Sequence, residues 1–152
     1  MRGWIYGFFM TWGMFLSIPC PVRIWDEKAR GKMMVCLPLV GAVVGGLWAL
    51  AAWLLGRIDC PAPVQALVLA AVPWLTTGFL HLDGYMDVCD AVLSRRDLAT
   101  RQKILKDSHC GAFAVIALGL LFLAQWSVFF TAGTVALLPL GMIPVATRAC
   151  AG

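Results

Sequence analysis

Charged residues are scarce in this sequence. Of its 152 residues, 13% are charged and 61% are hydrophobic. A soluble domain carries about a quarter charged residues, so this scarcity excludes an ordinary soluble protein and indicates an integral membrane protein. The sequence also lacks an internal repeat, a low-complexity stretch and a second polar region of domain size. We therefore expect a single membrane domain over residues 1–152.

The sequence has six cysteines but no Cys-x-x-Cys pair. The cysteines are scattered among apolar stretches, which favours buried free thiols over a disulfide framework or a zinc site. There is no basic arm and no interleaving of aromatic and basic residues, so we expect no nucleic-acid partner. The net charge of +4 instead points to phosphate-rich substrates or anionic lipid headgroups.

Long apolar runs take up most of the chain. They predict an all-α fold, a polytopic transmembrane helical bundle with about four to five hydrophobic segments in the lipid bilayer. These segments are residues 3–22, which span the membrane or lie at its surface and are broken by Pro19 and Pro21; residues 35–55; residues 61–80; and two spans within 111–147 that join near 131–133. In the second segment, Gly41 and Gly45 have the spacing that lets another helix approach closely, or they are simply tolerated there.

Basic residues are concentrated in two polar segments. Residues 23–34 hold four and residues 83–110 hold five of the twelve Lys and Arg residues. Two spans separate these segments, so both lie on the same side of the membrane. Because short loops rich in Lys and Arg stay inside, we expect both segments to face the cytoplasm from the bacterial inner membrane.

Three carboxylates stand within eight residues, at Asp83, Asp87 and Asp90. On an α-helix this i, i+4, i+7 spacing puts all three on one face, where like charges repel. A cation would relieve that repulsion, and oxygen ligands suit a hard divalent ion such as Mg²⁺ or Mn²⁺. We therefore predict a metal site here with the active site facing the cytoplasm; the alternative is a solvated polar face at the end of a membrane helix.

A basic segment follows the carboxylates directly. Its residues either bind substrate phosphate, beside a metal that neutralises developing charge, or merely obey the rule for basic residues in cytoplasmic loops. The predicted phosphate-binding residues are Arg95, Arg96, Arg101 and Lys106.

Two further side chains are candidates for catalysis. His81 precedes Asp83 by two residues and so points away from the acidic face of a continuous helix; it acts as a general base or as a structural partner. Asp107 lies at the mouth of the next span, where it caps that helix or completes the site.

Residues 77–91 resemble the signature of the cobalamin 5′-phosphate synthase family, the adenosylcobinamide-GDP ribazoletransferases. The family pattern is His-x-Asp-Gly-x-x-Asp-x-x-Asp-Gly/Ala, and each fixed position of it is matched between residues 81 and 91. Residues 104–108 with 111–113, residues 15–19 with 37–41, and the pair 147–148 resemble three other regions of the family. The resemblance therefore covers nearly the whole chain.

This resemblance implies a reaction. Adenosylcobinamide-GDP would transfer its cobinamide phosphate to α-ribazole, or to its 5′-phosphate, with release of GMP in the last steps of cobalamin biosynthesis. The sequence departs from the family at Lys103, where an acidic residue is usual, at His109, where Arg is usual, and at Tyr85, where Leu is usual. It also lacks the family's later spans and Gly-Asp-x-x-Gly motif. The resemblance therefore implies an amino-terminal portion, incomplete at its C-terminus, that is inactive alone.

Two other functions fit the residues less well. CDP-alcohol phosphotransferases of phospholipid synthesis also use an Asp-Gly-x-x motif, but they follow it with Ala-Arg, where this chain has Asp87 and Val88. A non-enzymatic transporter or assembly subunit would carry ionisable groups in the middle of its spans, and these spans carry none.

Overall fold

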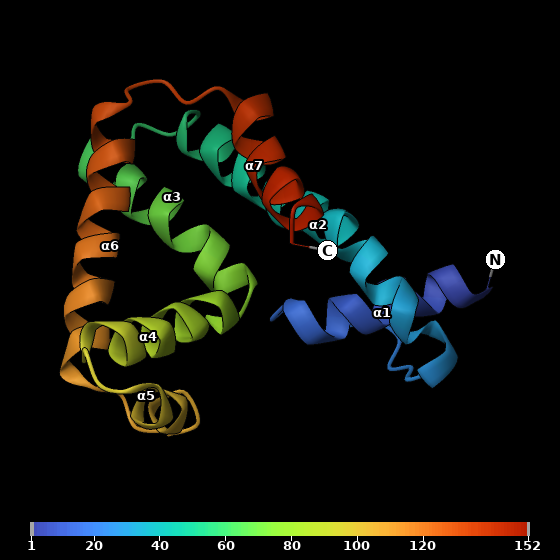
Figure 1. The fold of residues 1–152 in the computed structure, drawn as a ribbon. Coiled ribbons are helices and arrows are strands. Elements are labelled where there is room, and N and C mark those ends of the chain that lie inside the picture. Colours follow the sequence, from blue (N-terminus) through green and yellow to red (C-terminus); the bar gives the residue numbers. More distant parts are fainter. Residues whose placement is uncertain (1, 152) are drawn as a thin grey trace.

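The structure, a computed structural model, describes residues 2–151 and is built from helices (Figure 1). The elements are α1 (Arg2–Phe15), the short 3-10 helix η1 (Glu27–Ala29), α2 (Arg30–Leu55), α3 (Ala62–Thr76), α4 (Leu80–Leu93), α5 (Leu98–Ile104), α6 (Ala112–Thr131) and α7 (Leu137–Ala149). The prediction of an all-α fold is confirmed.

Two pairs of helices form the frame of the molecule. α2 packs along α7 and α3 packs along α6; the pairs are close together near the 56–61 turn and the 132–136 loop and diverge toward the other end (Figure 1). The α2–α7 contact depends on glycine, because a Cβ at Gly45 would collide with the carbonyl oxygen of Gly141 and one at Gly41 would lie 2.5 Å from that of Pro144. The expectation that Gly41 and Gly45 admit a second helix is confirmed.

The frame is joined by a cluster of large apolar side chains at the converging end. Trp48 of α2, Leu69 of α3 and Leu140 of α7 are each less than 7% exposed and pack together. The Trp48 indole donates a hydrogen bond of 2.7 Å to the Leu69 carbonyl oxygen, so its polar nitrogen is paired inside this apolar cluster. α1 packs on α2 separately, through Met10 and Met33.

The chain turns sharply between α3 and α4. Residues 61–80 were predicted as one clean span, but α3 ends at Thr76 and α4 leaves it at an angle of 92°. Gly78 and Phe79 form the corner, with positive φ angles of 58° and 63°. Ser17 contacts the end of α3, where its Oγ donates a hydrogen bond of 2.5 Å to the Leu75 carbonyl oxygen. The predicted span is therefore not one continuous helix, because the carbonyl oxygens of Leu75 and Thr76 accept hydrogen bonds from Ser17 rather than from a further helical turn.

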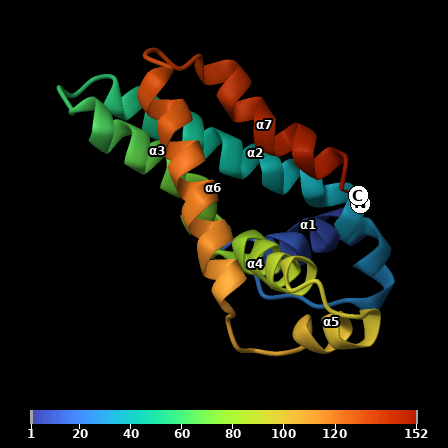
Figure 2. The same ribbon diagram turned by 60° about the vertical axis from the view of Figure 1, so that its left-hand side comes forward.

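Within residues 2–151, two helices are long and apolar enough to cross a membrane, α2 with η1 and α6, and the bent pair α3–α4 counts as a third if it is one span. Each of the four to five predicted apolar segments contains a helix, but α7 is shorter than a full span. The basic segments, in η1, early α2 and α5, lie at the end of the frame opposite the 56–61 turn (Figure 2).

Candidate functional site

The three carboxylates of α4 line one pocket. This acidic pocket has a volume of about 220 Å³ and lies between α4, the 107–110 loop and the start of α6. Its lining consists of Asp83, Met86, Asp87, Asp90, Asp107, Ser108, His109, Cys110 and Ala114. The i, i+4, i+7 spacing therefore predicted the shared face correctly. The pocket holds four carboxylates, and within the described chain no Lys or Arg side chain lines it.

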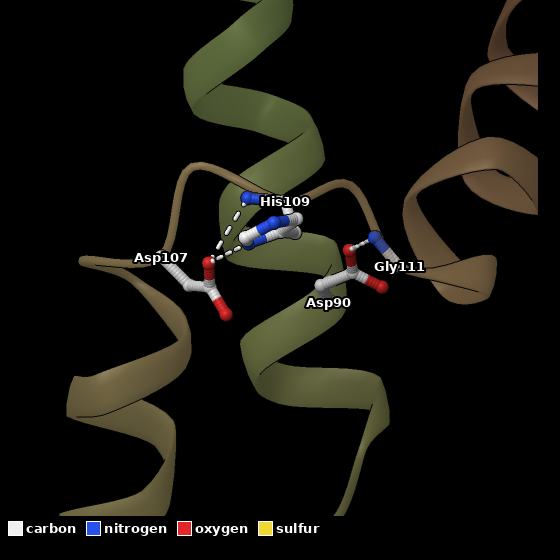
Figure 3. Close-up of polar contacts among 4 residues, drawn as sticks. All are labelled: Asp90, Asp107, His109 and Gly111. Atoms are coloured by element: carbon white, nitrogen blue, oxygen red, sulfur yellow. Dashed lines mark hydrogen bonds and ion pairs between the residues drawn. The ribbon is translucent and has the colours of Figure 1, made fainter.

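Asp90 joins α4 to the start of α6. Asp90 is 8% exposed, and its carboxylate accepts two backbone hydrogen bonds, from Gly111 N–H at 2.6 Å (Figure 3) and from Ala114 N–H at 2.9 Å. These donors belong to the first turn of α6, whose N–H groups have no partner inside the helix, and the carboxylate also lies at the positive end of the helix dipole. Asp90 thus caps α6 from a neighbouring helix and fixes the loop that closes the pocket.

Asp107 pairs with His109 across the same loop. One carboxylate oxygen, Oδ1, lies 2.6 Å from the imidazole Nδ1 and accepts the backbone N–H of His109 at 3.1 Å (Figure 3). The hydrogen bond to Asp107 raises the pKa of His109, and the same bond lowers the pKa of Asp107. Of the two predicted roles of Asp107, capping of α6 is wrong, since Asp90 does this; Asp107 lies in the site instead.

Asp83 and Asp87 are the uncommitted carboxylates of the pocket. Among residues 2–151, neither side chain has a hydrogen bond or an ion pair. In the same part of the chain, no three His, Cys, Asp or Glu side chains lie close enough together to bind a metal ion as they stand. This donor set still fits Mg²⁺, which typically binds through one or two carboxylates and completes its shell with water and substrate phosphate. Both oxygens of the third predicted ligand, Asp90, accept backbone hydrogen bonds from the start of α6, although each carboxylate oxygen has a second lone pair.

The predicted phosphate-binding residues lie beside the pocket but do not line it. Arg95, Arg96, Arg101 and Lys106 are on α5 and its two flanking turns. Asp97 begins α5 by accepting from Thr100 N–H at 3.2 Å and from Thr100 Oγ1 at 2.6 Å, and these bonds lower its pKa. Lys106 immediately precedes the pocket-lining residue Asp107, so the basic segment ends next to the pocket.

His81 lies away from the acidic pocket. It is on the first turn of α4, where its imidazole stacks on the ring of Phe15 with a centroid distance of 6.2 Å. It is not among the pocket-lining residues, as its two-residue offset from Asp83 predicted. Its catalytic role stays a prediction.

A larger open cavity of about 610 Å³ lies beside α1 and the 16–25 loop. Its lining is mostly apolar, with Arg23 as its one charged side chain within the described chain. The acidic pocket is the better candidate site despite its smaller size, because it gathers ionisable groups from separate parts of the chain at one place.

Two residues of the site were not predicted as functional. The sequence analysis noted His109 only as a departure from the family pattern. The sequence feature that could have indicated its contact is its position two residues after Asp107. Gly111 had only a place in the family resemblance, within residues 111–113; a Cβ there would lie 2.5–2.7 Å from the Asp90 carboxylate, so only glycine leaves room for the cap. That requirement depends on a contact across 21 positions and has no local signature.

The fold and the site define a helical membrane protein with a carboxylate-lined pocket between α4, the 107–110 loop and the start of α6. The family described as cobalamin-5-phosphate synthase matches residues 7–152, and the chain belongs to this family. No solved structure matches the chain.

Curated relatives of this chain carry the name adenosylcobinamide-GDP ribazoletransferase. The protein of Clostridium perfringens strain 13 is 43% identical over 145 residues, which are 94% of this chain and 58% of the relative. That of Clostridium botulinum strain Eklund 17B is 42% identical, over 83% of this chain and 50% of the relative. That of Halalkalibacterium halodurans is 37% identical, over 97% of this chain and 58% of the relative. The chain thus spans about half the length of the curated relatives it matches.

Proposed function

We propose that this chain carries the site at which the cobinamide phosphate of adenosylcobinamide-GDP is transferred to α-ribazole, or to its 5′-phosphate, with release of GMP. The names of the relatives and the family membership support this transfer reaction. The single observation that carries it is the acidic pocket, where Asp83, Asp87, Asp90 and Asp107 come together beside a basic segment.

Asp83 and Asp87 would hold Mg²⁺, or Mn²⁺, with Asp90 as a third ligand. An ion held there would neutralise phosphate charge and so make GMP a better leaving group. Without a cation, the free carboxylates of Asp83 and Asp87 would repel an approaching diphosphate. The protein therefore needs a positive charge between its own acidic groups and its anionic substrate.

Arg95, Arg96, Arg101 and Lys106 are the proposed phosphate-binding residues. Arginine can bind a phosphate through two parallel hydrogen bonds, which orients it as well as neutralising it. Asp107, which lines the pocket, is the proposed catalytic carboxylate, and His81 remains a second catalytic candidate.

The protein would lie in the bacterial inner membrane with the acidic pocket toward the cytoplasm. The basic residues near η1 and α5 support this orientation, since both groups lie at the end of the frame opposite the 56–61 turn (Figure 2). The nucleotide-linked substrate would then be available on the side that the pocket faces.

A product assay tests the function. We define the extended chain as this chain joined to the part of the C. perfringens strain 13 relative that it does not match. Membranes with this chain or the extended chain are incubated with adenosylcobinamide-GDP, α-ribazole and Mg²⁺, and corrinoid products are separated by chromatography. We expect cobamide from the extended chain and none from this chain alone.

Two results would contradict these expectations. No cobamide from the extended chain, together with phospholipid formed from CDP-diacylglycerol and an alcohol, would assign it to CDP-alcohol phosphotransfer. Cobamide from this chain alone would show that the further segment is dispensable. A chain with Asp59→Asn, a change in the 56–61 turn far from the pocket, is the matched control and should behave as wild type.

A further inference from the structure

The larger cavity beside α1 has no role in the proposed function. It measures about 610 Å³, whereas the acidic pocket measures about 220 Å³. Sites for small organic molecules typically measure about 300–1,000 Å³. The acidic pocket therefore has room for a metal ion and phosphate groups, and the bulky parts of the two substrates need space elsewhere. The larger cavity has the size of a site for one of them.

Contacts between α1 and the 16–25 loop hold the walls of this cavity in place. The Trp12 indole of α1 donates a hydrogen bond of 3.0 Å to the Ile18 carbonyl oxygen. Further along the loop, Cys20 Sγ lies 3.5 Å from the Phe9 carbonyl oxygen. The loop is thus fastened to α1 at two points, so the cavity is formed by the fold itself, as is usual for ligand sites.

The cavity lining is largely apolar and keeps few side-chain donors for a ligand. Phe9 lines the cavity from α1 and Trp25 from the loop. The Ser17 hydroxyl donates to the Leu75 carbonyl oxygen, and the Trp25 indole donates to the Glu27 carboxylate at 2.7 Å. Because these donors are already paired, the lining is poorly suited to reading the edge of a polar base such as guanine. It is well suited to holding an apolar aromatic ring.

Arg23 supplies the only charge in the described part of the lining. Within residues 2–151 its side chain has no ion pair, so the guanidinium is able to bind an anion. Arginine binds phosphate through two parallel hydrogen bonds. The cavity thus combines an apolar surface with one cation, which fits a ligand made of an apolar aromatic group and a phosphate.

The cavity lies next to the helix that carries the acidic pocket. Phe15, which directly precedes the cavity-lining residue Leu16, stacks on His81 of α4. His81 is two residues before Asp83, the first carboxylate of the acidic pocket. The end of α1 and the start of α4 lie close together (Figure 1). A ligand in the cavity would therefore lie beside the start of α4.

We propose that this cavity binds the acceptor of the transfer, with the benzimidazole of α-ribazole 5′-phosphate against Phe9 and Trp25 and its phosphate on Arg23. This inference rests on the proposed function. The benzimidazole is an aromatic ring system with methyl groups and without exocyclic polar groups, so it matches the apolar lining better than guanine does. The 5′-phosphate takes no part in the transfer, because a hydroxyl is the acceptor, and it is free to bind Arg23. An anionic phospholipid also combines an apolar part with a phosphate and is the competing occupant.

Binding measurements test the proposal without turnover, because this chain contains the whole cavity. Equilibrium dialysis in phosphatidylcholine nanodiscs measures the affinity for α-ribazole 5′-phosphate and for α-ribazole, and empty nanodiscs correct for partition into lipid. Gly13→Leu should fill the cavity, since Gly13 lines it and a Cβ there meets only the Cys20 Cβ, at 3.9 Å, in the described chain. Gly46→Leu on α2 is the matched control, because a Cβ at Gly46 meets nothing within 4 Å and Gly46 is outside the lining.

The two cavity variants should affect the two ligands differently. We expect Gly13→Leu to weaken the binding of both ligands at least about tenfold, because the added side chain takes up their space, and Gly46→Leu to leave both unchanged. Arg23 is exposed to solvent, so Arg23→Gln should weaken the binding of α-ribazole 5′-phosphate about three- to tenfold. The affinity for α-ribazole, which has no phosphate, should stay as in wild type.

Two results would overturn the proposal. One is affinity for both ligands in Gly13→Leu and Arg23→Gln equal to that of wild type. The other is no saturable binding of either ligand to wild type; if native mass spectrometry then shows less phosphatidylglycerol retained by these two variants, the cavity is a lipid site. The proposed function fails separately: if the extended chain forms no cobamide while the predicted binding is observed, the reaction is refuted and the binding site stands.

Discussion

Replacing Asp90 with alanine should weaken the joint between α4 and α6. The change removes both acceptors of a carboxylate that is 8% exposed and leaves the N–H groups of Gly111 and Ala114 without their partners. Each buried donor left unpaired costs about 1–3 kcal/mol, so the two donors together cost about 2–6 kcal/mol. Because the adjacent pocket lets water reach the freed groups, we expect the lower half of the sum, about 2–4 kcal/mol.

The matched comparison is Asp87→Ala, which changes the same residue type on the same face of the same helix. Asp87 has no hydrogen bond or ion pair in the described chain, so its loss should leave the free energy of unfolding nearly unchanged. Asp90→Asn should fall between the two, because an amide oxygen can replace only one carboxylate acceptor.

Unfolding in detergent mixtures and amide hydrogen exchange measure these effects. Asp90→Ala should lower the unfolding midpoint and speed exchange at Gly111 and Ala114, with no change at the α2–α7 contact. Equal midpoints and equal exchange in Asp90→Ala and Asp87→Ala would refute the assignment of Asp90 as the cap of α6.

Three other expectations follow from single contacts. Gly45→Ala should destabilise the protein by about 1–3 kcal/mol and Gly46→Ala should not, because a Cβ at Gly45 meets the Gly141 carbonyl oxygen and one at Gly46 meets nothing within 4 Å; equal unfolding midpoints would contradict this. The Asp107–His109 pair should stabilise the loop at pH values between the ordinary carboxyl pKa and the ordinary imidazole pKa. Because the pKa of His109 is raised, the stabilisation from His109 is lost as the pH rises through that raised pKa. Because the pKa of Asp107 is lowered, the stabilisation from Asp107 is lost as the pH falls through that lowered pKa. The protection factor of the His109 amide against hydrogen exchange, measured as a function of pH, tests this stabilisation. A protection factor that does not change with pH and equals that of Asp107→Asn would exclude it. Single cysteines at Asp59 and Ser94, in chains without the native cysteines, should be labelled from opposite sides of the membrane; labelling from the same side would contradict the orientation.

The periodic features of the fold were predictable from sequence, whereas the long-range contacts were not. The spacing of Asp83, Asp87 and Asp90 fixes a common face on any helix, and Gly41 and Gly45 indicate a close helix contact, because both patterns act within two turns. The hydrogen bond from Gly111 to Asp90 joins residues 21 positions apart. The residues around either position do not indicate that the two meet, so this cap could not be predicted from sequence.

The corner at residues 78–79 illustrates a second limit. Gly78 is an ordinary residue in a membrane helix, and Phe79 rarely adopts a positive φ, so the local sequence favoured continuation of the span. The break is stabilised instead by Ser17, whose hydroxyl and backbone N–H bond to the carbonyl groups at the end of α3. Such a break depends on tertiary contacts and cannot be predicted from helix periodicity.

Manganese binding tests the central claim most directly, because the account makes the acidic pocket a metal site within a transferase. Water proton relaxation is measured on the purified chain with Mn²⁺, for wild type and for Asp83→Asn, Asp87→Asn and Asp90→Asn. Asp59→Asn serves as the control. Loss of a direct ligand should weaken binding at least about tenfold, the lower range found for outer-shell partners of metal sites. We predict such weakening in all three variants; binding equal to wild type in all three would mean that the carboxylates form only a solvated face.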